Sequence, residues 1–206
     1  MKKLFTADWH FGAVMERPFK SAEHLVSRVI TGLNQRAKEG DVVYHVGDAV
    51  TRGVSPLITT DESGQRVKTK FEGSRLKIGD YLSQIVADVI LIEGNHCYNN
   101  AVKPHIKVGF VDVGRYIAFL SHYPTTFDKN VIFDFREQVR WHRLIQAAAV
   151  VADFALVGHV HGQWKHQYDN KLGLWNLNVG IDVNDWLPVT SEEVVHEFEH
   201  LTERRK

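Results

Sequence analysis

Short apolar runs alternate with amphipathic segments along this chain, which is the pattern of an α/β layered fold. The apolar runs have the length of buried strands, and they cover residues 3–7, 41–46, 89–92, 109–113, 116–120, 154–157 and 174–179. The later strands follow one another more closely than the early ones. This crowding predicts a mixed sheet or two stacked sheets.

Helical periodicity predicts helices over residues 21–38, 74–87 and 136–152. Ser21 can cap the first of them, and Gly40 follows its end. Thr190 and Glu193 have the spacing of a capping box, which predicts that a last helix begins there. We expect one domain over residues 1–206, with an inserted hairpin at about 54–73.

Polar residues follow five of the apolar runs directly, where each strand would reach the rim of a sheet. If these rims converge on one edge, two Asp, one Asn and five His side chains meet there. They are Asp8, His10, Asp48, Asn95, His96, His122, His159 and His161.

This set of side chains is suited to a pair of divalent metal ions. Carboxylate, amide oxygen and imidazole together suit hard or borderline cations. Two ions about 3.5–4 Å apart need a shared ligand, and Asp48 is the natural bridge. His96 stands beside Asn95, from where it can reach a substrate held over the ions. A single Asp or His of this kind is usually a surface residue, so the inference rests on the whole set.

Composition excludes several classes of protein. The hydrophobic fraction of 44% and charged fraction of 24% are ordinary for a globular domain. A formal net charge of zero gives no long-range field for nucleic acid or an anionic membrane. No apolar stretch reaches the ~20 residues of a membrane span. A single cysteine, Cys97, rules out an internal disulfide, so we expect a cytoplasmic location.

We call the five short polar segments that follow these apolar runs the islands. They read D-x-H, G-D, G-N-H, a lone His and G-H-x-H, in that order. This order resembles the calcineurin-like metallophosphoesterases along almost the whole chain. The likeness is nearest to small bacterial and phage phosphoesterases, which also show R-P-F at Arg17, S-H-Y-P at Ser121 and N-V-G-I-D-V at Asn178. The resemblance implies a four-layer α/β/β/α sandwich with mixed sheets.

The resemblance also implies a ligand set for two ions. The first ion would be bound by Asp8, His10, Asp48 and His161, and the second by Asp48, Asn95, His122 and His159. A metal-bridging hydroxide would attack phosphorus in line with the leaving oxygen. His96 would stabilise the charge or protonate the leaving group, and Asn95 and His96 would contact substrate. Manganese is the expected metal, although Fe, Ni, Co and Zn accept the same ligands.

The chain departs from the family pattern at two positions. Many relatives carry G-D-x-x-D and an acidic residue after G-N-H, where this chain has Thr51 and Cys97. His96 therefore lacks an evident carboxylate partner in the sequence. Arg52 invites comparison with the phosphate-clamping arginine of protein phosphatases, and Arg17 is a weaker candidate for that role.

The expected function is hydrolysis of phosphoric esters of small or nucleotide-like molecules, with a slight preference for phosphodiesters because no second arginine clamp can be placed. A phosphomonoesterase is the main alternative. A nuclease and a non-catalytic descendant that only binds ligands are the remaining alternatives. We expect a phosphorylated small-molecule or nucleotide substrate and no membrane, and nucleic acid is not favoured. The sequence does not determine the oligomeric state.

Overall fold

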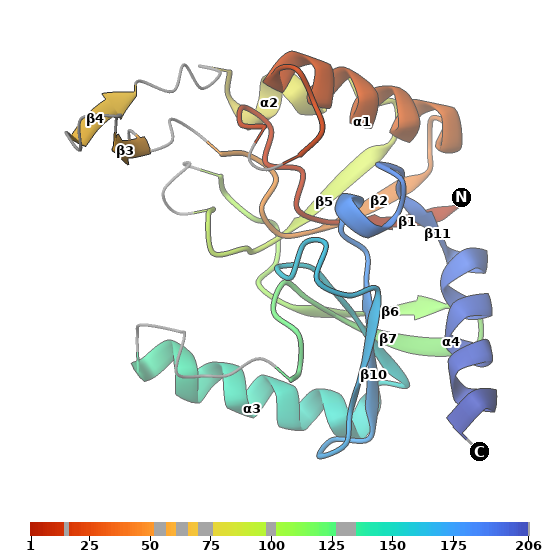
Figure 1. Ribbon diagram of the computed structural model, residues 1–206. Coiled ribbons are helices and arrows are strands. Elements are labelled where there is room, and N and C mark those ends of the chain that lie inside the picture. The colour runs from red at the N-terminus through yellow and green to blue at the C-terminus, as the bar shows by residue number, and fades with distance from the viewer. Residues whose placement is uncertain are drawn as a thin grey trace.

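The computed structural model describes residues 1–14, 17–51, 57–60, 66–69, 76–97, 102–126 and 135–205, with backbone alone for 57–60, 66–69 and 135–142. Two β-sheets lie between helices, and the chain enters the second sheet after the first and returns to the first near its C-terminal end (Figure 1). None of the helices within these residues is long and apolar enough to cross a membrane.

The first sheet has four strands in the order β11-β1-β2-β5. Its strands are β1 (Lys3–Thr6), β2 (Val42–Val46), β5 (Asp88–Ile92) and β11 (Val189–Thr190). β1, β2 and β5 run parallel, and the short β11 pairs antiparallel with β1. The carboxyl ends of the three parallel strands therefore meet at one edge.

The second sheet has five strands in the order β6-β7-β8-β10-β9. These strands are β6 (Gly109–Val113), β7 (Tyr116–Ser121), β8 (Phe154–Val157), β9 (His166–Asp169) and β10 (Leu174–Asn178). β7, β8 and β10 are parallel, whereas β6 and β9 are antiparallel edge strands. A separate pair, β3 (Leu57–Thr60) and β4 (Arg66–Thr69), forms an antiparallel ladder.

Helices cover the outer faces of the two sheets (Figure 1). They are α1 (Ala22–Arg36), α2 (Ile78–Leu82), α3 (Phe135–Val151) and α4 (Ser191–Arg205). α1 and α2 lie on the first sheet and α3 lies on the second, while α4 runs along the side of the molecule. The four-layer α/β/β/α arrangement expected from the sequence is confirmed.

Alternation along the strands creates separate hydrophobic layers. Leu4 packs with the α1 and α2 side chains, whereas its neighbour Phe5 faces the second sheet. Phe154 belongs to the same inter-sheet layer, and Ala155 faces α3. Because successive side chains point to opposite faces of a strand, each central strand contributes to two layers of the core.

Local signals in the sequence place most helix ends correctly. Ser21 accepts a hydrogen bond from the backbone N–H of His24 at 3.2 Å and caps α1. The Thr190 and Glu193 capping box forms reciprocally at the start of α4, with bonds of 2.8 and 3.2 Å. The helix expected over 74–87 is shorter, because α2 spans only Ile78–Leu82. Strands β9 and β11 were not anticipated.

The two sheets meet at the edge where their parallel strands end. Ala7, just beyond β1, forms a parallel bridge with Gly180, just beyond β10. The backbone N–H of Ile181 also donates to the carbonyl of Ala7 at 3.2 Å. The loops that follow six parallel strands are thereby gathered on one side of the molecule.

Candidate metal centre

The loops after β1 and β2 run side by side and carry the first three site residues. The N–H of Asp8 donates to the carbonyl of Gly47, and that of His10 donates to the carbonyl of Asp48, both at 3.0 Å. These backbone bonds turn the three side chains inward, and all three are almost completely buried. Hydrogen bonds between backbone groups thus hold together two loops that are separated by about forty residues in the sequence.

The backbone is strained at five of the eight candidate residues. Their φ angles are positive although none is glycine: Asp8 58°, His10 48°, Asp48 62°, His159 72° and His161 48°. Such conformations are uncommon for side chains with a Cβ, and they persist only where the surroundings enforce them.

Close approach explains two of the glycines that precede site residues. A Cβ atom on Gly94 would lie 2.3 Å from Oδ1 of Asp48, and one on Gly47 would lie 2.3 Å from Nδ1 of His122. No real side chain tolerates such a contact. The glycines of the G-D and G-N-H motifs are therefore required by the packing of the site itself.

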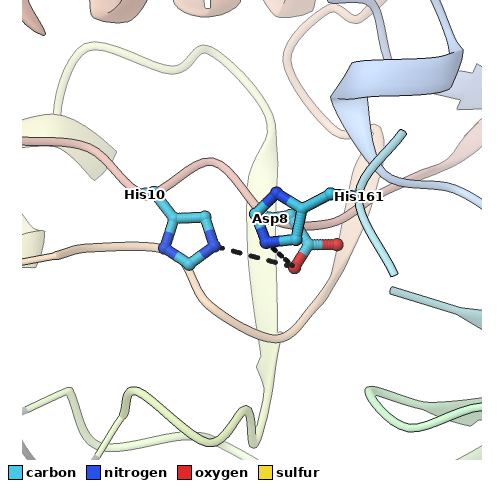
Figure 2. A group of neighbouring side chains, drawn as sticks. All are labelled: Asp8, His10 and His161. Carbon is cyan, nitrogen blue, oxygen red and sulfur yellow. Dashed lines mark ion pairs between the residues drawn. The ribbon is translucent and has the colours of Figure 1, made fainter. Parts of the chain in front are cut away.

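One group of ligand atoms comes from Asp8, His10 and His161 (Figure 2). Nε2 of His10 lies 3.8 Å from Oδ1 of Asp8, and Nε2 of His161 lies 3.9 Å from the same oxygen. The two rings stack at 5.0 Å between centroids. Oxygen and nitrogen atoms thus face a common point from β1 and β8.

A second group surrounds the end of β7. Nε2 of His122 lies 2.8 Å from Oδ1 of Asn95 and 3.2 Å from Oδ2 of Asp48. Nδ1 of His159 lies 3.1 Å from the same Asn95 oxygen. Ligands bound to one ion at about 2.0–2.2 Å have separations of this order.

Asp48 lies between the two groups. Its Oδ2 is 3.2 Å from Nε2 of His122 on one side and 3.9 Å from Nε2 of His10 on the other. Its Oδ1 accepts a hydrogen bond from the backbone N–H of His96 at 2.9 Å. Asp48 is therefore within reach of both groups, and Asp8 also belongs to a group with Asp48 and His122 as well as to the one with His10 and His161.

Charge is concentrated in this buried volume. Burial alone would raise the pKa of Asp48, but the positive charge and hydrogen bond of His122 hold that pKa well below its usual range. Burial likewise opposes ionisation of Asp8, yet the neighbouring rings of His10 and His122 lower its pKa. Burial would lower the pKa of His122, but Asp48 raises it to about 9. Both carboxylates are therefore ionised at neutral pH.

The arrangement fits a bound cation, because one buried nitrogen has no other partner. Nε2 of His10 is inaccessible to solvent and accepts or donates no hydrogen bond within the described residues. Burial lowers the pKa of His10, so its ring is neutral there. With Nδ1 occupied by Thr51, the free nitrogen faces two carboxylates. A divalent ion would bind all three groups.

His96 lies at the rim rather than in the ligand shell. Its side chain is 42% exposed, and its Nε2 is 3.9 Å from Oδ2 of Asp48. The ring meets that of His10 edge to face at 5.4 Å. The imidazole is therefore near both groups of ligand atoms and remains open to an incoming molecule.

Partners on the far nitrogen hold three of the imidazoles in place. Nδ1 of His122 lies 3.0 Å from the carbonyl oxygen of Val46, and Nδ1 of His10 lies 2.7 Å from Oγ1 of Thr51. Nδ1 of His161 lies 3.3 Å from Oδ2 of Asp182. Such contacts fix the ring orientation and the tautomer of a ligating histidine.

Asp182 is the site residue that the sequence interpretation missed. It follows β10 in the short 3₁₀ helix η2 (Ile181–Val183), at the same edge as the five islands. The rule that located the islands, a polar residue just after an apolar run, also applies to the run at 174–179. The sequence therefore also indicates a sixth strand end with a polar residue beyond it.

The sequence offers Arg17 and Arg52 as candidate phosphate clamps, and it leaves the role of Cys97 open. Arg17 is not a phosphate clamp, because its buried guanidinium contacts Asp182 and backbone carbonyls. Arg52 lies outside the described residues.

Cys97 is buried, and its Sγ accepts a hydrogen bond from the N–H of Gly94 at 3.2 Å, which makes it a packing residue. Burial raises the pKa of this thiol.

The sequence matches the model of the calcineurin-like phosphoesterase family over residues 1–191. This range includes every residue of the metal centre described above. No curated protein matches the chain.

One of the similar solved structures shows the same fold. A protein of unknown function from Aquifex aeolicus, AQ665, is 18% identical with a TM-score of 0.59, covering 95% of this chain and 98% of its own. A novel archaeal phosphodiesterase is 17% identical, with a TM-score of 0.40 over 87% of this chain and 84% of its own. The E. coli phosphoesterase Yfce is 16% identical, with a TM-score of 0.39 over 86% and 78%. The last two likenesses bear on neither substrate nor mechanism.

Proposed function

This chain belongs to the calcineurin-like phosphoesterase family and is a metal-dependent phosphoric ester hydrolase, and on that premise we propose that it acts as a dinuclear phosphodiesterase on small or nucleotide-like substrates. The observation that carries the proposal is the position of Asp48. Its Oδ2 lies 3.9 Å from Nε2 of His10 and 3.2 Å from Nε2 of His122, a position from which it would bridge two ions.

Seven residues would hold the two ions: Asp8, His10, Asp48, Asn95, His122, His159 and His161. Asp8, His10 and His161 would bind the first, with Asp48 bridging to the second. Divalent ions such as Mn²⁺, when bound, would activate water and neutralise charge on the phosphoryl oxygens. The buried carboxylates and the rigid loops that bear them exclude solvent from the far side of the ions.

His96 would act on the leaving group. Its exposed ring stands at the rim, 3.9 Å from Oδ2 of Asp48, and its backbone is fixed by the hydrogen bond to Oδ1 of the same residue. A general acid in this position can donate a proton to the departing oxygen, which contributes typically about 10²–10⁴-fold to the rate. Asn95, which is exposed, would contact the substrate beside it.

The choice of a diester rests on the cationic side chains around the site. A monoester dianion benefits from an arginine fork in addition to the metals. Arg17, the described arginine that lies nearest to Asp8 in the sequence, binds Asp182 and backbone carbonyls instead. A diester carries less charge and needs a protonated leaving group, which His96 can supply. Phosphomonoester hydrolysis is the alternative, with Arg52 as the candidate clamp.

The proposal is tested by hydrolysis of bis-p-nitrophenyl phosphate beside p-nitrophenyl phosphate, in Mn²⁺ and after chelation. Wild type should turn over the diester faster and should stop when the metal is removed. Asp48→Asn should lose this turnover, whereas Asp112→Asn, on an exposed position of β6, should keep it. Preference for the monoester would favour the phosphatase alternative.

Two further outcomes would favour the remaining alternatives. Cleavage of DNA with a steep salt dependence would indicate a nuclease. A protein that binds Mn²⁺ fully and hydrolyses neither ester nor DNA would indicate a non-catalytic descendant that only binds ligands.

The buried thiol of Cys97 forms no disulfide, which suits the reducing cytoplasm, and we propose the cytoplasm as the location.

A further inference from the structure

Asp182 joins the metal centre from a strand that contributes no ligand of its own. It lies in η2, directly after β10, and its side chain is 11% exposed. Its Oδ2 is 3.3 Å from Nδ1 of His161, the nitrogen opposite the one that faces Asp8. The carboxylate therefore contacts a candidate ligand and belongs to neither group of candidate ligand atoms.

Arg17 binds both oxygens of this carboxylate through two nitrogens of its guanidinium. Nε donates to Oδ1 of Asp182 at 2.8 Å, and Nη2 donates to Oδ2 at 2.7 Å. The side chain is 4% exposed, so the pair is shielded from water. A two-point grip fixes the plane of the carboxylate as well as its position.

The same guanidinium also binds the loop that bears the first ligands. Nη2 donates to the carbonyl oxygen of Asp8 at 2.6 Å, and Nη1 donates to that of Trp9 at 3.0 Å. Four of the five N–H groups of Arg17 are engaged in this way. One side chain thus connects the loop after β1 with the loop after β10.

We propose that Asp182 and Arg17 are positioning residues that orient His161 and set its spacing from Asp8 at the first metal ion. The inference rests on the proposed metal centre. A carboxylate that accepts the Nδ1–H fixes the tautomer and leaves the lone pair of Nε2 directed at the ion. His161 needs this support, because its side chain is one-third exposed and its backbone φ is positive.

Arg17 adds a constraint that Asp182 alone would not provide. Asp8 and His161 are 153 positions apart, and their ligand atoms, Oδ1 and Nε2, lie 3.9 Å apart. Arg17 binds the backbone of the first residue and the carboxylate that supports the second. The distance between two ligands of one ion is therefore held by a single buried side chain.

The test is a titration of the metal-free protein with Mn²⁺, in which electron paramagnetic resonance measures the concentration of the free ion. Asp182→Asn should weaken one of the two bound ions by about 10–100-fold, the usual effect of losing such a partner. The matched control is Asp185→Asn, which removes the same charge from an exposed position three residues away. It should bind Mn²⁺ as the wild type does.

A second pair of variants separates positioning from simple stabilisation. His161→Ala should weaken the same ion, and adding Asp182→Asn to it should cause no further loss, because Asp182 acts through that ring. Arg17→Lys keeps the charge but loses the fork, so it should weaken the same ion as Asp182→Asn. Thermal unfolding of each metal-free variant reports separately on the fold.

Three results would overturn the inference. The first is that Asp182→Asn leaves both Mn²⁺ affinities unchanged. The second is that it lowers only the unfolding temperature of the metal-free protein, and the third is that its effect persists in full in the His161→Ala background. Any of these, with a wild type that binds Mn²⁺, would reject the positioning role and leave the metal centre standing. A wild type that binds no Mn²⁺ would overturn the metal centre and this inference together.

Discussion

The hydroxyl oxygen of Thr51 lies 2.7 Å from Nδ1 of His10. The G-D-x-x-D pattern of many similar proteins has an aspartate at this position, where this chain has Thr51. Here the residue contacts the ring of a candidate ligand of the first ion. The hydroxyl therefore helps to fix the orientation of the His10 imidazole.

Replacing Thr51 with Val should weaken Mn²⁺ binding by about 10-fold, at the lower end of the usual effect of losing such a contact. The two side chains have similar shapes, so the loss comes from the missing hydrogen bond to His10. Thr51→Ser retains the hydroxyl and should bind Mn²⁺ as the wild type does. Equal affinities for the Val and wild-type proteins, measured by titration, would contradict this role.

Gly94→Ala should abolish most of the activity while the protein still folds. The added Cβ would lie 2.3 Å from Oδ1 and 2.4 Å from the backbone nitrogen of Asp48, so Asp48, the proposed bridging ligand, must move. A displacement of about 1 Å at a reacting centre can lower the rate about 100-fold. Metal-dependent hydrolysis and circular dichroism would be measured together. Gly79→Ala is the control, since nothing lies within 4 Å of its Cβ position.

His96→Ala should lower kcat by about 10²–10⁴-fold without changing the Mn²⁺ content. The ring stands outside the ligand groups, and its Nε2 is 3.9 Å from Oδ2 of Asp48. If His96 protonates the leaving group, the loss should be larger for an alkyl ester than for a p-nitrophenyl ester, whose leaving group needs no proton. An equal loss for both esters would favour a role in stabilising charge on the phosphoryl group.

His45 should make the metal-free protein less stable in mild acid. Both ring nitrogens are buried with no hydrogen-bond partner in the described part of the chain, and burial lowers the pKa of the ring to about 3 from 6.5. Below pH 6.5 the unfolded chain takes up a proton that the folded chain does not. The free energy of unfolding should therefore fall toward pH 3, by at most about 1.4 kcal/mol per pH unit from this group.

His45→Leu should remove that component, because leucine has a similar volume and does not titrate. The comparison is urea unfolding with chelator present, at several pH values between 4 and 7.5. His200→Leu is the control, since that histidine is exposed on α4. If His45→Leu shows the pH dependence of the wild type, other groups carry it.

Local rules predicted the parts of the fold that depend on neighbouring residues. The central strands were found because each is a short apolar run, and α1 was found because Leu25, Val29 and Leu33 repeat at helical spacing. β9 was missed because His166–Asp169 is polar and mostly exposed. It is a strand only because it pairs with the edge of β10.

The sequence by itself determined the order of the central strands and the helices and the polar residues at five strand ends, because these follow from local spacing. The order of its motifs also showed the resemblance to the family. Only the tertiary structure decided which atoms face one another. It placed Asp48 between His10 and His122, and it brought Arg17 to Asp182 across 165 positions. Such contacts depend on how two sheets stack and where their loops meet, and no local pattern in the chain encodes that geometry.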